Sequence, residues 1–449
     1  MWHKLVSRIT SQVTPHITTG QRSVLVNSAW LMAEKFLLMG GGLLLSILFA
    51  RGLGSEDFGR FNYVLSFVML FGPLFALGMF NVLLRELSKS PQNAPTILKT
   101  CLIARIIAGV TISLIAIAII YWYLGDTWKF ATISLLLVCH ITNGFEVYER
   151  WFQHKSNNEV LVKWRVCNFA VFMLFKFYLL YIDAEFSTVL ILVSIEVVCK
   201  NLGYGFLYRR YQDYPQKGRY EHQVFKDVFE QSKYLIVAAF AAIVYFKIDI
   251  IMLEAMRPIS EVGIYSVAAK ISEVCYILPQ VVITAMYPNL LEIAKTQPKR
   301  YDALLQRGFD WLFISALGIS VVTFFVSPWI VGLLFGEEYT LAGQILQLHI
   351  FASLFVYMRV LLSQWLVTIS FAQFALFRES SGAIVNILLN LWLIPLYGVW
   401  GAAIATIISY AVSSYVCLWF FSRTRPIAVM MTKSMGFVFR IKQIVSALP

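Results

Sequence analysis

The sequence carries little charge for its length. Only 14% of its 449 residues are Asp, Glu, Lys or Arg, whereas 59% are hydrophobic and the mean hydropathy is +0.70. Soluble domains carry roughly 25% charged residues, so this composition excludes a soluble protein. A membrane-spanning β-barrel would alternate polar and apolar residues over segments of about ten, but the apolar runs here are continuous. The composition therefore predicts an all-α integral membrane protein.

Cysteine is scarce as well. The six cysteines lie in or beside apolar runs and none forms a C-x-x-C pair, which argues against a disulfide framework and against a zinc site. The sequence also lacks the H-E-x-x-H, DxD and Gly-rich phosphate-loop patterns. We therefore expect no metal, no cofactor and no enzymatic activity. The net charge of +12 does not indicate a nucleic-acid partner, because membrane proteins concentrate Lys and Arg in cytoplasmic loops.

Runs of about 20 apolar residues predict twelve transmembrane helices. Short connections separate them, and the predicted outer loops hold few cations (Arg51, Arg60, Lys129 and Arg257). This bias predicts that both termini are cytoplasmic. The predicted spans are 27–50, 61–82, 102–124, 128–149, 164–182, 186–208, 233–253, 262–288, 308–333, 341–365, 375–396 and 399–422.

The chain also divides into two similar halves. Ser55–Phe61 opens the second span and Ser260–Tyr265 opens the eighth, with Gly59 and Gly263 as equivalent positions 204 residues apart. Six spans in each half give both halves the same orientation, as in transporters built from parallel repeats. The predicted organisation is a cytoplasmic N-terminal segment (1–26), an N-lobe (27–208), a cytoplasmic inter-lobe loop (209–232), a C-lobe (233–422) and a basic cytoplasmic tail (423–449).

Charged residues inside the predicted spans are the main functional signal. Each costs a few kcal/mol at mid-bilayer, so each should face a cavity or a partner. Arg105 lies near the start of its span, where it is expected to snorkel to the interface. Glu196 with Lys200, and Lys270 with Glu273, have spacings that allow pairing within one helix. The cations are Lys35, Arg105, Lys176, Lys200, Lys247, Lys270 and Arg359, and the acids are Glu34, Glu196, Asp249 and Glu273.

Lys247 and Asp249 are two positions apart, so they point to different sides of a helix and cannot pair with each other. At least one of them needs a partner on another span or contact with water. Lys35 and Lys176 have no opposite charge three or four positions away. These residues, with Arg359, indicate a cationic, water-filled lumen that fits an anionic cargo such as a phosphate. The alternative is a set of interhelical ion pairs that only stabilise the bundle.

Several short motifs follow one another along nearly the whole chain. They are Ala50–Gly54 with Phe58-Gly59, Phe246–Leu253, Val262–Ser266 with Pro279 and Pro288, Phe335–Tyr339, Asn386–Asn390 with Ile394–Gly398, and Gly401–Thr406. In this order they resemble Wzx-type polysaccharide repeat-unit flippases of the multidrug/oligosaccharidyl-lipid/polysaccharide (MOP) exporter superfamily.

The resemblance implies a fold of twelve transmembrane helices in two pseudo-symmetric six-helix lobes, as in MATE transporters. It implies a flippase that moves undecaprenyl-pyrophosphate-linked oligosaccharides from the cytoplasmic to the periplasmic leaflet of the bacterial inner membrane. Ion-coupled alternating access would drive this step in O-antigen or related polysaccharide synthesis, with H+ or Na+ as the coupling ion. The expected partners are membrane lipids, a polysaccharide polymerase and a chain-length regulator.

Two sets of site residues follow as expectations. The cationic lumen is expected to bind the substrate through Lys35, Arg51, Lys176, Lys200, Lys247, Lys270 and Arg359. Ion coupling is expected at Asp249, Glu273 and Glu34.

Three other functions compete with this hypothesis. A different lipid-linked or small-molecule cargo could use the same fold, although cationic drugs would favour an acidic site. A membrane-embedded glycosyltransferase or polymerase would need a large extramembrane loop, which the sequence lacks. A structural scaffold would not need so many intramembrane cations, each of which is costly.

Overall fold

The computed structural model describes residues 19–124, 127–212, 218–369, 371 and 373–436, which form helices and no strands. The N-terminal segment up to residue 18, part of the inter-lobe loop and the end of the basic tail (437–449) lie outside the described residues. Within the described chain, ten helices are long and apolar enough to cross a membrane. The prediction of an all-α membrane protein is confirmed.

The difference between ten such helices and twelve predicted spans has two causes. The first two predicted spans fall in one candidate span, Trp30–Lys89. The first span and the start of the second lie in α2 (Thr19–Leu70), whose only break is Gly54 at φ 74° and ψ 175°. Side-chain-bearing residues rarely adopt that conformation, so glycine supplies the kink where a loop was expected. The fifth predicted span corresponds to α8 (Asn158–Tyr181), which is not among the ten. It carries several polar and charged residues, including Lys163, Arg165 and Lys176.

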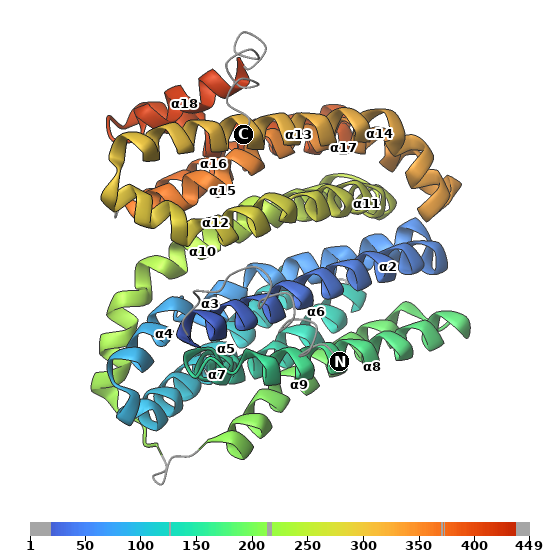
Figure 1. The fold of residues 1–449 in the computed structure, drawn as a ribbon. Coiled ribbons are helices and arrows are strands. Elements are labelled where there is room, and N and C mark those ends of the chain that lie inside the picture. The colour runs from blue at the N-terminus through green and yellow to red at the C-terminus, as the bar shows by residue number, and fades with distance from the viewer. Residues whose placement is uncertain (1–18, 125–126, 213–217, 370, 372, 437–449) are drawn as a thin grey trace. The chain divides into compact units, whose positions relative to one another are not determined.

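The chain folds into two compact units (Figure 1). Unit 1 comprises Met1–Leu45 and Phe71–Ile236, and unit 2 comprises Ser46–Leu70 and Val237–Pro449. Helix α2 is therefore divided between the two units. Its first part belongs to unit 1, and Ser46–Leu70 belongs to unit 2. The sequence had assigned this segment to the N-lobe.

Unit 1 surrounds a core that includes Leu83, Leu98, Trp151, Phe152 and Tyr204. This core joins short helices at one end of the unit to the long α5 and α9. The complete helices of unit 1 are α3 (Gly72–Ala76), α4 (Phe80–Lys89), η1 (Pro91–Asn93), α5 (Ala94–Leu124), α6 (Thr127–His140), η2 (Ile141–Glu146), α7 (Val147–His154), α8 and α9 (Phe186–Tyr211).

Unit 2 holds most of α10 (His222–Met256), which begins in unit 1. Its further helices are α11 (Ile259–Cys275), α12 (Ile277–Thr296), α13 (Pro298–Phe335), η3 (Glu337–Tyr339), α14 (Thr340–His349), η4 (Ile350–Ala352), α15 (Ser353–Thr368), α16 (Phe374–Tyr397), α17 (Val399–Ser414), η5 (Val416–Phe420) and α18 (Arg425–Met435).

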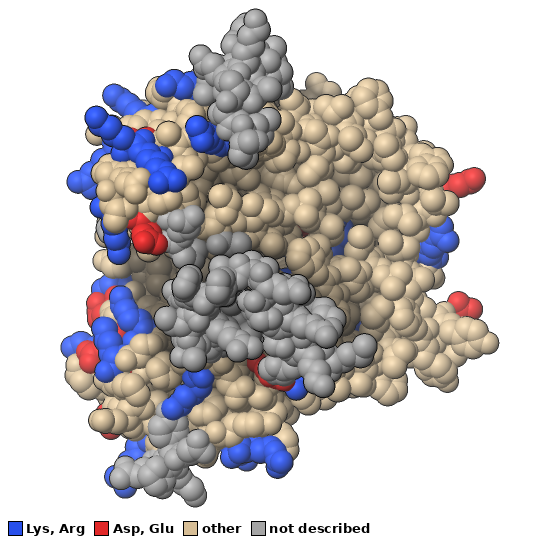
Figure 2. Space-filling model, viewed as in Figure 1, with Lys and Arg blue, Asp and Glu red and all other residues tan. Residues whose placement is uncertain are grey.

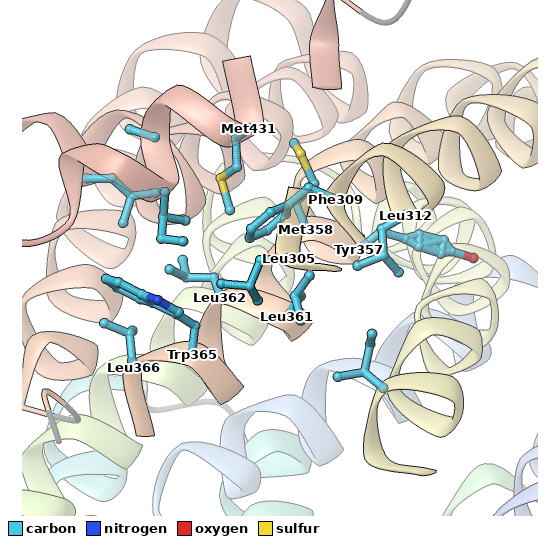
Figure 3. Packing of buried hydrophobic residues seen from close by; sticks show 14 of the residues in the cluster. Leu305, Phe309, Leu312, Tyr357, Met358, Leu361, Leu362, Trp365, Leu366 and Met431 are labelled. Carbon is cyan, nitrogen blue, oxygen red and sulfur yellow. The ribbon is translucent and has the colours of Figure 1, made fainter. Parts of the chain in front are cut away.

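One hydrophobic core of unit 2 is formed mainly by α12, α13, α15 and α18. Figure 3 shows Leu305 and Phe309 of α13 facing Leu362 of α15, with Met431 of α18 closing the cluster. The amphipathic tail helix α18 thus buries its apolar face against α13 rather than in lipid. Its exposed face is basic, and Figure 2 shows Lys and Arg side chains gathered over α18 and the neighbouring end of α13.

Candidate functional site

Asp249 of α10 lies at the centre of a buried polar network in unit 2. Its side chain is only 4% exposed. The Asn390 amide donates to Oδ1 over 2.6 Å, and the Thr406 and Tyr265 hydroxyls donate to Oδ2 over 2.5 and 2.9 Å. Asn390 also donates to Asn386 Oδ1 over 3.0 Å. Helices α10, α11, α16 and α17 thus each contribute a side chain to one site.

All the groups that hydrogen-bond the Asp249 carboxylate are neutral. Within the described parts of the chain, no Lys or Arg forms an ion pair with it. The Asn390 Oδ1 atom is buried beside it without a hydrogen-bond partner. An uncompensated carboxylate in a membrane interior is costly, so a bound proton or a hard cation would stabilise it. Carboxylate, hydroxyl and amide oxygens are the ligands that such cations prefer.

The other two acids expected to couple ions have cationic partners. Glu273 accepts a hydrogen bond from Lys247 Nζ over 2.8 Å. Glu34 accepts one from Arg165 Nη2 over 2.7 Å. The expected partner of Lys247 on another helix therefore exists, and Asp249 differs from Glu273 and Glu34 in having none among the described residues.

Several of the expected lumen cations also form ion pairs between helices. Lys176 of α8 pairs with Glu196 of α9, so Glu196 does not pair with Lys200 within its own helix. Lys200 instead lies 3.7 Å from Glu146. In unit 2, Arg359 Nη2 donates to Glu379 Oε1 over 2.8 Å.

Three of the expected substrate-binding residues form no ion pair with another described residue. The Lys35 side chain is exposed, and Lys270 is half-buried on α11 near Glu273. Arg51 is exposed and donates to the Leu333 carbonyl oxygen over 2.5 Å. Their part in binding a substrate stays a prediction.

The expectation that Arg105 snorkels to the interface is wrong. Its side chain is only 7% exposed, and it donates to Glu146 over 3.0 Å and to the Phe75 carbonyl oxygen over 3.3 Å. Glu146 lies in η2, the short 3-10 helix that follows α6. This break between helices places the Glu146 carboxylate beside α5, where it accepts a hydrogen bond from the buried Arg105 guanidinium.

Sequence reasoning missed further charged residues that the fold brings together. In unit 1, Arg165 Nη1 donates to Glu149 over 3.0 Å, and Glu149 also pairs with Arg150 at 3.4 Å. In unit 2, Arg378 shares the Glu379 carboxylate with Arg359. The adjacent Arg378-Glu379 near the start of the predicted span 375–396 was a usable sequence signal for this cluster.

Besides Asp249 and the pairs described above, two groups of ion-paired residues each have one more cation than acids, and the additional cation of the first, Lys200, is 35% exposed. We name the first the unit 1 network: Glu34, Arg105, Glu146, Glu149, Arg150, Arg165 and Lys200. We name the second the Arg359 cluster: Arg359, Arg378 and Glu379. The Arg359 guanidinium also lies over the rings of Tyr245 and Phe246, 5.5 and 5.1 Å from their centroids. This excess of positive charge favours an anionic ligand.

Residues 24–294 match the polysaccharide biosynthesis protein family. This match covers more than half of the chain, and the chain belongs to that family.

The chain is also similar to the probable low-salt glycan biosynthesis flippase Agl15 of Haloferax volcanii, with 23% identity over 42% of this chain. The aligned stretch spans 40% of that flippase's length. Among solved structures, the lipid II flippase MurJ has a TM-score of 0.67 at 13% identity and covers 95% of this chain and 93% of its own. An inward-facing multidrug resistance MATE transporter of the MOP superfamily has a TM-score of 0.69 at 12% identity, with coverage of 92% and 96%.

The MurJ and MATE structures show that the chain has the fold of MOP-superfamily transporters, and the family match shows a polysaccharide biosynthesis protein. The predicted fold class is confirmed by the MurJ and MATE neighbours. The prediction of a transporter rather than an enzyme agrees with these comparisons, because the similar proteins are named as flippases and transporters. Wzx-type specificity stays a prediction.

Proposed function

We propose that this protein flips undecaprenyl-pyrophosphate-linked oligosaccharide repeat units from the cytoplasmic to the periplasmic leaflet of a bacterial inner membrane. Both termini would be cytoplasmic, and the product would enter O-antigen or related polysaccharide synthesis. A polymerase and a chain-length regulator would act on the flipped units. Coupling to an H+ or Na+ gradient would drive alternating access.

The observation that carries the cargo class is the excess of positive charge in the Arg359 cluster. Burying a cation without an acid in a membrane protein is expensive, yet this buried cluster contains two cations and one acid. Arg binds phosphate in a bidentate geometry. A diphosphate head group would therefore compensate charge that the protein itself leaves unbalanced, while the polyprenyl tail stays in lipid.

The observation that supports ion coupling is the carboxylate of Asp249. A permanently charged, buried carboxylate without a cation would be unfavourable, so a transported H+ or Na+ is a natural counterion. The surrounding Thr406 hydroxyl and Asn390 amide supply neutral oxygens. Binding and release of such an ion would change the charge of the site by one unit, which can shift a conformational equilibrium.

The test uses a bacterial strain that lacks its own repeat-unit flippase. The strain is complemented with the wild type, with Arg359→Gln or with Lys299→Gln at matched expression. Lys299 is an exposed cation of the same unit, so its variant controls for the loss of a charge. Surface polysaccharide is quantified, and the leaflet that holds the lipid-linked oligosaccharide is determined in parallel.

The proposal expects wild type and Lys299→Gln to restore polymer, and Arg359→Gln to leave the oligosaccharide on the cytoplasmic leaflet. Full rescue by Arg359→Gln would remove the Arg359 cluster from the cargo site. Failure of the wild type to restore polymer in strains with different repeat units would contradict the cargo assignment. It would leave another lipid-linked or small-molecule cargo as the leading function.

A further inference from the structure

The exposed side of α18 and the start of α13 carry cations that the protein does not neutralise. Figure 2 shows Lys and Arg side chains gathered over this part of unit 2. Five of them are exposed, and none forms an ion pair with another described residue. We name these five the basic surface: Arg300 and Arg307 on α13, Arg423 in the turn before α18, and Arg425 and Lys433 on α18.

Helices α13 and α18 lie side by side and run in the same direction. The Gln306 amide donates to the Met430 carbonyl oxygen over 3.0 Å, and the Ser434 hydroxyl donates to the Asp310 carboxylate over 2.7 Å. Both pairs are 124 positions apart. Because the separation stays constant over one helical turn, each residue of α18 lies level with the residue of α13 that precedes it by this number.

This register arranges the cations of the two helices in two tiers. Arg425 lies next to the level of Arg300, and Lys433 lies between the levels of Arg307 and Trp311. The tiers are about 11 Å apart, since each residue of a helix adds about 1.5 Å. Arg300 and Arg307 are seven positions apart, so both point to one side of α13.

The inner tier marks the boundary of the apolar layer. Residues 311–335 of α13 and residues 399–422 contain no charged residue, and each run is long enough to cross a bilayer. Arg423 follows the second run directly. Trp311 and Trp419 lie near the charged ends of these runs and are 52% and 40% exposed. Because exposed Trp at the end of a transmembrane helix marks the head-group level, the basic surface begins at that level.

The basic surface is held on a packed scaffold. Met431 on the opposite face of α18 is buried in the core of unit 2. Arg425 Nε donates to the Trp419 carbonyl oxygen over 3.1 Å, and the Arg423 guanidinium lies 5.6 Å from the centroid of the Phe371 ring. These contacts orient the two guanidinium groups before a ligand binds, which lowers the entropic cost of binding.

The ligand that fits this surface is the head group of an anionic phospholipid. Arg and Lys bind phosphate oxygens directly, and their attraction to an anionic leaflet acts over a Debye length of about 10 Å, which reaches both tiers. An acidic segment of a partner protein would supply the same charge. Lipid is favoured because the cations lie beside exposed aromatic side chains, Trp311 and the 70% exposed Phe420, which suit a bilayer interface.

We propose that the basic surface binds anionic phospholipids in the leaflet next to this end of α13 and thereby holds α18 at the head-group level. The proposal goes beyond the proposed function and depends neither on the cargo nor on the coupling ion. It assigns a ligand to the basic tail of the chain, which the cargo and ion sites do not use.

The first test measures lipid binding by the full chain in detergent. The variant that tests the surface combines Arg423→Gln, Arg425→Gln and Lys433→Gln. The probes are phosphatidylglycerol, phosphatidylcholine with the same acyl chains, and a polyglutamate peptide. The control variant removes the same net charge from exposed lysines that are paired with Glu86, Glu159 and Glu230, and it combines Lys89→Gln, Lys163→Gln and Lys233→Gln.

The wild type and the control variant should bind phosphatidylglycerol in preference to phosphatidylcholine. The basic-surface variant should bind phosphatidylglycerol about tenfold more weakly or worse, because each removed cation lowers the attraction to anionic lipid. Equal affinity of the wild type and this variant overturns the proposal. Tighter binding of polyglutamate than of phosphatidylglycerol overturns it in favour of an acidic protein partner. Should the triple variant fail to fold, Arg300→Gln with Arg307→Gln on α13 repeats the test.

The second test locates the lipid in a bilayer. The photoreactive amino acid benzoylphenylalanine replaces Val429, which is exposed between Arg425 and Lys433 on α18. In the control it replaces Leu388, which is 60% exposed on α16. Both proteins are reconstituted into vesicles of equal parts phosphatidylglycerol and phosphatidylcholine, irradiated, and analysed by mass spectrometry.

Adducts at position 429 should contain phosphatidylglycerol in several-fold excess, whereas adducts at position 388 should contain both lipids in similar amounts. The excess at position 429 should fall at high salt, because salt screens the attraction. Equal proportions of the two lipids at both positions overturn the proposal, as does the absence of any lipid adduct at position 429.

Discussion

The side-chain amide of Asn390 donates to the carboxylate of Asp249 over 2.6 Å, although the two residues are 141 positions apart in the sequence. Three helices besides that of Asp249 supply neutral donors to this site, and none supplies a cation within the described residues. The site is therefore polar enough to stabilise a charge yet lacks the counterion that Glu273 and Glu34 have. This difference makes Asp249 the first residue to test for ion coupling.

Replacing Asp249 by Asn should abolish ion-driven transport, with a loss of about tenfold or more, because a neutral amide cannot supply the intramembrane charge that a coupling ion would balance. Transport of labelled lipid-linked oligosaccharide in proteoliposomes measures the effect. Asp302→Asn is the matched control, since Asp302 is an exposed carboxylate of the same unit, and it should transport like the wild type. Normal gradient-driven transport by Asp249→Asn would exclude this carboxylate from coupling.

Transport measured in the same proteoliposomes under imposed ion gradients identifies the coupling ion. A proton-coupled protein should respond to an imposed pH gradient at zero Na+ gradient, and a Na+-coupled protein should show the reverse, because only the ion that binds can shift the equilibrium. If a gradient drives transport by the wild type but not by Asp249→Asn, the ion of that gradient binds at the Asp249 site. Transport that is insensitive to both gradients would contradict coupling altogether.

Lys247 and Glu273 provide a test that separates stability from cargo binding. Lys247→Met leaves the Glu273 carboxylate without its 2.8 Å partner. Because the Glu273 side chain is 39% exposed, solvent screens the pair, and its loss should cost about 1 kcal/mol. The double variant Lys247→Glu with Glu273→Lys should recover most of the thermal stability, measured in detergent by fluorescence-detected size exclusion.

The same double variant should still transport poorly if Lys247 faces the cargo, because the positive charge has moved to a different helix. Wild-type transport by the exchanged pair would show that Lys247 serves only to hold α10 and α11 together. That outcome would favour the structural interpretation of the intramembrane cations.

Leu305 should be important for the stability of unit 2. It is buried in the cluster between α13, α15 and α18 (Figure 3), and truncating a buried Leu to Ala costs about 2–5 kcal/mol through the cavity that remains. Leu388→Ala is the matched control, because Leu388 is 60% exposed on α16 and lies outside this cluster. A melting temperature that falls equally in both variants would contradict the packing of this cluster.

The two faces of α18 should respond differently to a charge. Met431 is fully buried against α13 whereas Val429 is exposed on the same helix. Met431→Asp should detach the helix and expose it to limited proteolysis, since burying an unpaired carboxylate is costly. Val429→Asp should have little effect on cleavage. Similar cleavage of both variants would indicate that α18 lies on the bilayer surface and not on α13.

The sequence alone determined that the protein is a helical membrane protein, and it located most of the spans. The length of an apolar run is a local property of the sequence, and it decides whether a segment can cross the bilayer. It also located the repeat through Gly59 and Gly263. It did not show that these equivalent glycines touch each other, since sequence similarity between two segments says nothing about their distance in space.

The pairing of the charges was decided only by the tertiary structure. Lys176 and Glu196, or Arg359 and Glu379, lie on different helices, so no spacing along one helix could join them. The prediction that Arg105 snorkels to the interface was wrong because its side chain pairs with Glu146. Glu146 lies in the short 3-10 helix after α6, and the pattern of apolar residues does not reveal this interruption. A buried charge in a membrane takes its partner from whichever helix packs beside it, and only the packed bundle determines which helix that is.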